Sequence, residues 1–241
     1  EDILKLIRQE GVGLVTDVGA TIASTKKAVA LSEQYDFIYA AVGVHPEGVE
    51  ELTNQDMDWL CKLAKREKVV AIGEIGLDYY YEDPKRDIQK IWFRKQLEVA
   101  RKTGLPVVIH SRDAAQDTLD IIKEEHGEQI GGVIHCFSYG KEMAQVYLDM
   151  GFYLGIGGVV TFKNGKKLKE VVKCTPIERI VLETDAPYLT PEPNRGKRNA
   201  SHYLKYVAQE IAQLKDFVAR NKARVSTRNM AMSRQKKLDK M

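Results

Sequence analysis

The chain has 241 residues, of which 44% are hydrophobic and 29% charged, as in an ordinary soluble globular protein. Collagen-like, disordered and disulfide-rich classes are therefore excluded, and no apolar run reaches the ~18 residues needed to cross a bilayer, so we expect no association with a membrane. The net charge is +3, but residues 216–241 hold eight Lys or Arg and two Asp or Glu, so the rest of the chain is slightly acidic.

The N-terminal residues 1–11 have the pattern of an amphipathic helix and lack the apolar core of a signal peptide. The chain begins without Met, so the alternatives are that an upstream segment has been removed or that it was never present. Short apolar runs rich in β-branched residues then recur, and continuous runs of this kind are typical of strands buried on both faces of a parallel sheet. The predicted strands lie within residues 14–20, 37–44, 69–76, 106–110, 131–137, 152–158 and 179–185.

Helical patterns separate these runs. Ser24 and Thr53 are the expected N-caps of the first two helices, and Gly104 ends the third, which has Pro84 in its first turn. The predicted helices cover residues 24–35, 53–68, 84–103, 112–126, 141–150, 164–173 and 200–215.

This alternation predicts the α/β class, and both an open doubly wound sheet and a (β/α)8 barrel fit it. The TIM-type barrel is favoured because nearly every strand ends in a charged, His or Gly residue, at the edge where barrels place their active sites. A barrel needs eight strands, so we predict an incomplete one whose first strand precedes residue 1. We expect one barrel domain over residues 1–215 and an atypical basic C-terminal tail over residues 216–241.

The cysteines Cys61, Cys136 and Cys174 are far apart in the sequence and form no CxxC pair. A disulfide framework or a zinc site made of cysteines is therefore not expected, which favours a reducing cytoplasmic environment.

Three of the five histidines follow apolar strand residues: His45, His110 and His135. One such histidine is usually structural, but three of them together with strand-end carboxylates at Glu74 and Asp185 favour a divalent metal site. Neighbouring strands lie about 4.8 Å apart, so side chains from successive strands can converge on one ion.

Glu74 lies between Gly and Ile in a strand expected to be buried, where a carboxylate is costly unless it is paired or bound to a metal. The alternative is a structural Glu held by an Arg or by backbone amides. Asp185 follows the same logic, with Glu183 on the same strand face. Asp78 is a further possible ligand, but we expect it to order the following loop.

Basic residues beside these positions suggest phosphate binding. Arg112 follows His110 by two residues, and Arg195, Lys197 and Arg198 lie in the loop 194–199. Arginine beside a metal site can hold a phosphodiester in a bidentate manner.

The motifs VGVHP, GEIGLDYY, VIHSRDA, HCFS, GGxVTFK, ETDAPYL and RGKRN occur in this order. Together they resemble the TatD family of metal-dependent deoxyribonucleases over roughly residues 1–215. The resemblance implies an amidohydrolase-type TIM barrel that hydrolyses DNA, typically as an exonuclease from the 3′ end of a single strand. It also implies two divalent ions (Mg, Mn or Zn), with Glu74 touching both, His110 and His135 completing one position, and Asp185 binding the other and acting as the base. His45, Arg112, Arg195 and Arg198 would surround the phosphate.

Two departures from the family pattern matter. The chain has no HxH motif, whose histidines would hold the second ion, so one ion is the expectation for this chain. Its last ~25 residues also differ from the family's usual helical ending. The alternatives are an amidohydrolase that acts on a cyclic amide or ester, and an inactive, truncated barrel.

Overall fold

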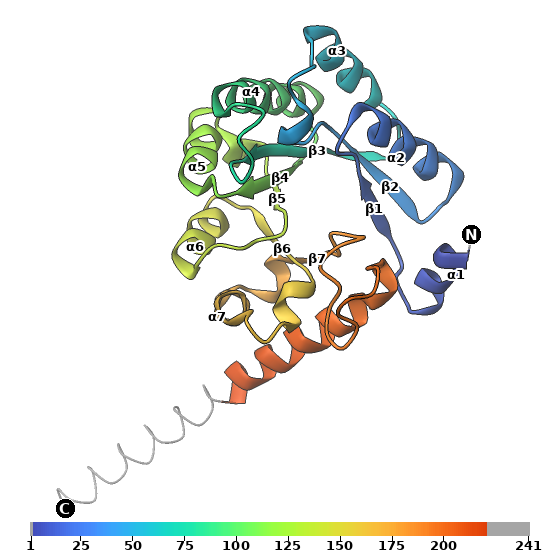
Figure 1. Cartoon of the computed structure of the whole chain (residues 1–241), viewed down its shortest axis with the longest axis vertical. Helices are drawn as coiled ribbons and strands as arrows, with labels where there is room; N and C mark the ends of the chain where they lie inside the picture. The colour runs from blue at the N-terminus through green and yellow to red at the C-terminus, as the bar shows by residue number, and fades with distance from the viewer. Residues whose placement is uncertain (1, 221–241) are drawn as a thin grey trace, which may run out of the picture.

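The computed structural model describes residues 2–220, and within them seven parallel strands form one curled sheet with the helices on its outer side (Figure 1). The strands pair in chain order, and β1 and β7 are the two outermost strands of the sheet. The predicted α/β TIM-type fold is therefore confirmed, as an incomplete barrel. The strands are β1 (Val15–Val18), β2 (Ile38–Val42), β3 (Val69–Asp78), β4 (Val107–Arg112), β5 (Gly132–Ile134), β6 (Tyr153–Ile156) and β7 (Ile180–Leu182).

Helices connect the strands and run antiparallel to them, as a parallel sheet requires. They are α1 (Asp2–Gln9), α2 (Ile22–Gln34), α3 (Asn54–Leu63), α4 (Arg86–Thr103), α5 (Ala115–Glu124), α6 (Lys141–Asp149) and α7 (Lys166–Cys174), and residues 204–220 are also helical. This last helix continues past the predicted end at residue 215. The remainder of the predicted basic tail, residues 221–241, lies outside the described residues.

The second helix starts earlier than its sequence pattern suggested. Thr21, not Ser24, is the N-cap of α2: its hydroxyl accepts the Ser24 N–H at 3.0 Å, while the Ser24 hydroxyl accepts the Thr21 N–H at 2.8 Å. This reciprocal capping box satisfies two backbone donors, which a cap at Ser24 alone would leave open. Thr53 is the N-cap of α3, as predicted, and Gly104 ends α4 in the left-handed conformation.

The main hydrophobic core lies between the sheet and the surrounding helices, with Phe93, Tyr147 and Phe152 among its largest fully buried side chains. A second, small cluster of Ala41, Ala71 and Val108 lies apart from it. Because side chains alternate along a strand, these small residues point to the concave face, where a tight curl leaves little room.

One irregularity of β3 controls the direction of Glu74. Ile72 pairs with Val107 and Ile75 pairs with Ile109, so three steps along β3 match two steps along β4. Both isoleucines belong to the helix-facing core. The extra residue is a β-bulge, and it allows Glu74 to point to the concave side without moving the apolar residues on either side of it out of the core.

Among the described residues, no helix combines the length and apolarity needed to span a bilayer. Cys61, Cys136 and Cys174 are free thiols, as their spacing predicted.

We expect Phe93→Ala to lower the free energy of unfolding by about 3–5 kcal/mol, because it removes a fully buried ring and leaves a cavity. Ile91→Ala on the same helix is the matched control, since Ile91 is 53% exposed, and its effect should stay within about 0.5 kcal/mol. Urea unfolding followed by circular dichroism measures both. Equal effects of the two substitutions would contradict this description of the core.

Candidate metal centre

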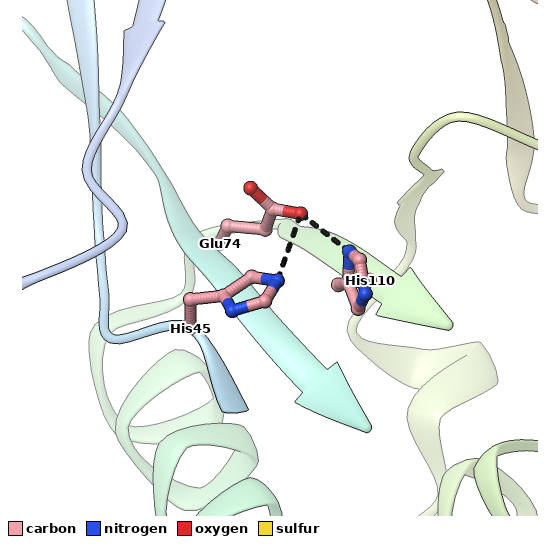
Figure 2. A group of neighbouring side chains, drawn as sticks. All are labelled: His45, Glu74 and His110. Carbon is pink, nitrogen blue, oxygen red and sulfur yellow. Dashed lines mark hydrogen bonds and ion pairs between the residues drawn. The ribbon is translucent and has the colours of Figure 1, made fainter. Parts of the chain in front are cut away.

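Three imidazole nitrogens surround one carboxylate oxygen at the carboxyl edge of the sheet. The Oε1 atom of Glu74 lies 2.8 Å from Nδ1 of His110, 3.7 Å from Nε2 of His135 and 3.9 Å from Nε2 of His45. Figure 2 shows His45 and His110 on two sides of this oxygen. The groups come from the loops after β2 and β5 and from strands β3 and β4, so the parallel sheet brings distant parts of the chain together.

The charges in this cluster support one another. Burial acts to raise the pKa of Glu74, but the hydrogen bond from His110 and the charge of His135 outweigh it and lower the pKa to about 2. Burial acts to lower the pKa of His110, yet its hydrogen bonds to Asp78 and Glu74 raise the pKa to about 9. Glu74 is thus ionised over the whole neutral range.

His45 has the opposite character. Burial and the neighbouring charge of His110 lower the pKa of His45 to about 4, despite the attraction of Glu74. Its contact with Glu74 is therefore not an ion pair at neutral pH. A neutral imidazole offers a lone pair, so His45 is ready to bind a cation without losing a proton.

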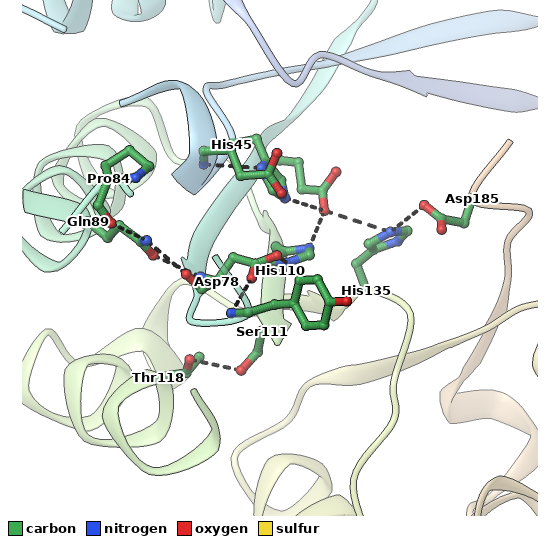
Figure 3. Close-up of polar contacts among 12 residues, drawn as sticks. His45, Asp78, Pro84, Gln89, His110, Ser111, Thr118, His135 and Asp185 are labelled. Atoms are coloured by element: carbon green, nitrogen blue, oxygen red, sulfur yellow. Dashed lines mark hydrogen bonds and ion pairs between the residues drawn. The ribbon is translucent and has the colours of Figure 1, made fainter. Parts of the chain in front are cut away.

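His135 is held between two carboxylates. Its Nδ1 bonds to Oε2 of Glu183 at 2.7 Å. Its Nε2 lies 3.5 Å from Oδ1 of Asp185, and Figure 3 shows this pair. Burial acts to lower the pKa of His135, but the charge of Glu183 and hydrogen bonding to Asp185 and Glu183 raise it well above the usual value. Glu183 therefore sets the orientation of the ring that meets Glu74.

Glu183 reaches His135 across strand β6. Its other oxygen, Oε1, accepts the backbone N–H of Cys136 at 2.7 Å. A Cβ atom on Gly155 would lie only 2.2 Å from Oε2 of Glu183. Because no side chain fits at this position, Gly155 is required for Glu183 to lie against the strand.

Asp78 connects the cluster to the loop after β3. Its Oδ2 bonds to Nε2 of His110 at 2.9 Å, and its Oδ1 accepts the backbone N–H of Tyr80 at 2.9 Å. The expectation that Asp78 orders the following loop is met. Asp78 also orients the His110 ring. Because Asp78 bonds to Nε2 of His110, the other ring nitrogen, Nδ1, faces Glu74.

Two buried glutamines of α4, two helical turns apart, hold the backbone beside the cluster. Gln96 accepts the Val44 N–H at 2.8 Å and donates to the Val44 carbonyl at 2.9 Å. Gln89 accepts the Asp78 N–H at 2.8 Å and donates to the Asp78 carbonyl at 2.8 Å. Each amide replaces a missing strand partner, so α4 fixes the segments that carry His45 and Asp78.

The donors fit a divalent cation. Ligand atoms of His45, Glu74 and His110 all lie within 4.8 Å of one another, and the same holds for those of His45, Glu47 and Asp78. Mixed imidazole and carboxylate sets of this kind suit zinc, manganese and related ions. These two groups share His45, which our sequence interpretation had placed near the phosphate and which the structure places against Glu74.

The three arginines expected near a phosphate are all exposed. Arg112 ends β4 and its guanidinium carbon lies 3.7 Å from the centre of the Tyr80 ring. Arg195 lies over Phe162 at 3.9 Å and donates to the Thr190 carbonyl at 3.3 Å. Arg198 lies in the same loop as Arg195.

The structure brings together all four residues that the sequence indicated as ligands, Glu74, His110, His135 and Asp185. Glu183, Gln89 and Gln96 also take part in this site, although none of the sequence motifs marks the roles of these three residues. A signal existed for Glu183, since it precedes Asp185 by two residues and glycines occur at positions 155 and 157, in and just after the neighbouring strand. The structure ends β7 at Leu182, so Glu183 and Asp185 lie beyond the strand and not on one of its faces. For Gln89 and Gln96, no motif of neighbouring residues predicts that they bond to the backbone beside the site.

Comparisons with known proteins agree with this geometry. The family model described as TatD related DNase matches residues 1–233. The chain is 46% identical over 229 residues to the metal-dependent hydrolase YabD of Bacillus subtilis, covering 95% of this chain and 90% of the relative. It is 37% identical over 231 residues to the metal-dependent hydrolase YcfH of Escherichia coli, covering 96% and 86%. Among solved structures, the TatD homologue YJJV of Escherichia coli superposes with a TM-score of 0.83 at 30% identity, covering 91% of this chain and 86% of that one.

We expect Gln96→Met to lower the free energy of unfolding by about 1–3 kcal/mol, because the buried Val44 N–H and carbonyl lose their partner. Gln116→Met is the control: Gln116 is exposed and donates to Asp120 one turn further along α5, so its loss should change stability little. Thermal unfolding compares the two. A Gln96→Met protein as stable as the control would show that the glutamine does not hold this segment.

Proposed function

This chain belongs to the TatD family of metal-dependent hydrolases, and we propose that it is a deoxyribonuclease that hydrolyses phosphodiester bonds from the 3′ end of single-stranded DNA. The observation that carries this proposal is the convergence of three imidazole nitrogens on Oε1 of Glu74. Such a set of donors at the carboxyl edge of a TIM-type barrel supports metal-assisted hydrolysis.

We assign the cation to Glu74, His110, His135 and Asp185, with His45 as an added ligand because its pKa of about 4 leaves it neutral. A divalent Mg, Mn or Zn ion held there supplies a Lewis acid that neutralises charge on a phosphoryl oxygen and lowers the pKa of a water molecule. The family resemblance implies two ions. The second group of donors, His45, Glu47 and Asp78, is the candidate site for the second ion.

The remaining chemistry falls to side chains of this chain. Asp185 is about one-third exposed, so its carboxylate can hold the attacking water and accept its proton. As the water oxygen bonds to phosphorus, the bond from phosphorus to the sugar oxygen of the preceding nucleotide breaks, and that oxygen leaves as a 3′-hydroxyl with the proton that Asp185 had accepted. Arg112, Arg195 and Arg198 donate N–H groups to the non-bridging oxygens, where negative charge grows.

An exonuclease needs to hold only one end of a strand. A broad basic surface is therefore not required, which is compatible with the slightly acidic body of this chain. The positive charge that the reaction needs is local and is supplied by the arginines and the cation.

We expect the purified chain with Mg²⁺ or Mn²⁺ to release mononucleotides from single-stranded DNA, and Glu74→Ala to reduce that rate by about 10²–10³-fold or more, since the shared carboxylate is lost. The bound-metal content, measured by inductively coupled plasma mass spectrometry, should fall with it. Glu178→Ala is the control, because Glu178 is exposed in the turn just before β7. It therefore lies at the amino ends of the strands, away from the metal centre at their carboxyl ends.

The same assay includes dihydroorotate as a cyclic amide. Hydrolysis of this amide without release of nucleotides would overturn the proposed substrate. A metal-loaded chain that acts on neither compound would favour an inactive barrel.

We expect Glu183→Gln to weaken binding of Mn²⁺ by about 10–100-fold, the usual effect of losing a partner that orients a metal-binding histidine. Glu183 uses one oxygen for the Cys136 N–H and the other for His135 Nδ1, and in Gln one of these two positions is an NH2 group that cannot accept. The His135 ring therefore loses the orientation that directs Nε2 toward Glu74. Isothermal titration with Mn²⁺ measures the affinity, with Glu178→Gln as the control. Unchanged affinity in Glu183→Gln would exclude this role.

A further inference from the structure

Two neighbouring tyrosines are exposed beside the metal centre. Tyr80 is 57% exposed and Tyr81 is 52% exposed, so both rings present apolar surface to solvent. They follow Asp78, the last residue of β3, and so lie at the carboxyl edge of the sheet. Tyr79 behaves differently: its hydroxyl donates to Asp117 at 2.6 Å and the ring packs against the core. Within one run of three tyrosines, the first anchors the loop and the other two face solvent.

The exposed rings are held in place. The Tyr80 backbone N–H donates to Oδ1 of Asp78, whose other oxygen bonds to His110. The two rings meet edge to face, with centroids 4.8 Å apart and an interplanar angle of 88°. Asp78 therefore ties the position of this aromatic pair to that of a metal-site histidine.

Arg112 completes the arrangement. Its guanidinium carbon lies 3.7 Å from the centre of the Tyr80 ring and 6.0 Å from that of Tyr81. Arg112 pairs with Asp78 in the β3–β4 register and follows His110 by two residues. A guanidinium stacked on a ring keeps its N–H donors in its own plane, where they can reach a phosphate.

We propose that Tyr80, Tyr81 and Arg112 form a stacking subsite for a nucleobase of single-stranded DNA, next to the phosphate that is cleaved. This inference rests on the proposed function and names the residues that hold the base. Aromatic faces with an adjacent cation are what proteins use to bind single strands without reading their sequence, because every base has a π-face. One face of Tyr80 lies against Arg112, so the base stacks on the remaining aromatic surface.

The fold provides a matched control. Tyr153 is 40% exposed, and the centre of its ring lies 5.1 Å from the guanidinium carbon of Arg179. It is therefore also an exposed tyrosine beside an arginine. Tyr153 is the first residue of β6 and Arg179 precedes β7, which places this pair at the opposite edge of the sheet. A general effect of exposed tyrosines would appear at both pairs.

The test compares two fluorescein-labelled decamers with phosphorothioate links, which resist hydrolysis. One is oligo-dT and the other has the same backbone with abasic sugars. Fluorescence anisotropy measures the affinity of each for the full chain. We expect Tyr80→Ala to lower the affinity for oligo-dT about tenfold, and the double Tyr80→Ala, Tyr81→Ala variant to lower it further. The affinity of either variant for the abasic decamer should change less than about twofold. Tyr80→Phe and Tyr153→Ala should match the unaltered chain.

Two results would overturn the subsite while leaving the proposed function intact, provided that the unaltered chain still hydrolyses DNA. In the first, the double variant binds oligo-dT as tightly as the unaltered chain. In the second, it loses the same affinity for both decamers, which would mean that the rings act through the phosphates and not through a base. If the unaltered chain neither binds oligo-dT nor hydrolyses DNA, the proposed function fails and the subsite fails with it.

Discussion

The carboxylate of Glu74 imposes the main constraint on this structure. It is an ionised group in a largely buried position, and the cost of removing it from water is offset by the hydrogen bond from His110 and the charge of His135. The neutral ring of His45 faces the same oxygen. Each of these rings must therefore be held at a definite place and angle. Much of the polar structure around the centre serves that purpose, and the same arrangement provides the donors that a divalent cation requires.

The supports for the rings come from outside the cluster and are mostly bonds to backbone. Gln96 holds the segment before His45, and Gln89 holds Asp78, which in turn bonds to His110. Glu183 performs the equivalent task for His135 from the opposite side. Because these partners are buried, their bonds are exposed to little competition from water, and small displacements are costly. A site built in this way is preorganised before any cation or substrate arrives.

The carboxyl edge of the sheet combines this rigid interior with an accessible rim. Asp185 is within reach of solvent, and Arg112 stacks on Tyr80 above the cluster. Asp78 belongs to both regions, since one oxygen faces His110 and the other holds the tyrosine loop. A substrate that engaged the rim would thus meet residues whose positions are already tied to the metal centre. This continuity is the physical basis of the proposal that a nucleobase binds beside the site of phosphodiester hydrolysis.

The sequence by itself determined the seven strands, the alternation with helices and the importance of Glu74, because apolar runs and helix caps depend on residues close together in the chain. It also placed His110 and His135 beside apolar strand residues, although β4 continues past His110 to Arg112 and β5 ends just before His135. The tertiary structure decided the rest. The bulge between Ile72 and Ile75 directs Glu74 inward, Gly155 leaves space for Glu183, and the α4 glutamines reach Val44 and Asp78. Each of these three features depends on strand register or on close approach between elements that are far apart in the chain. A pattern of neighbouring residues therefore does not predict it.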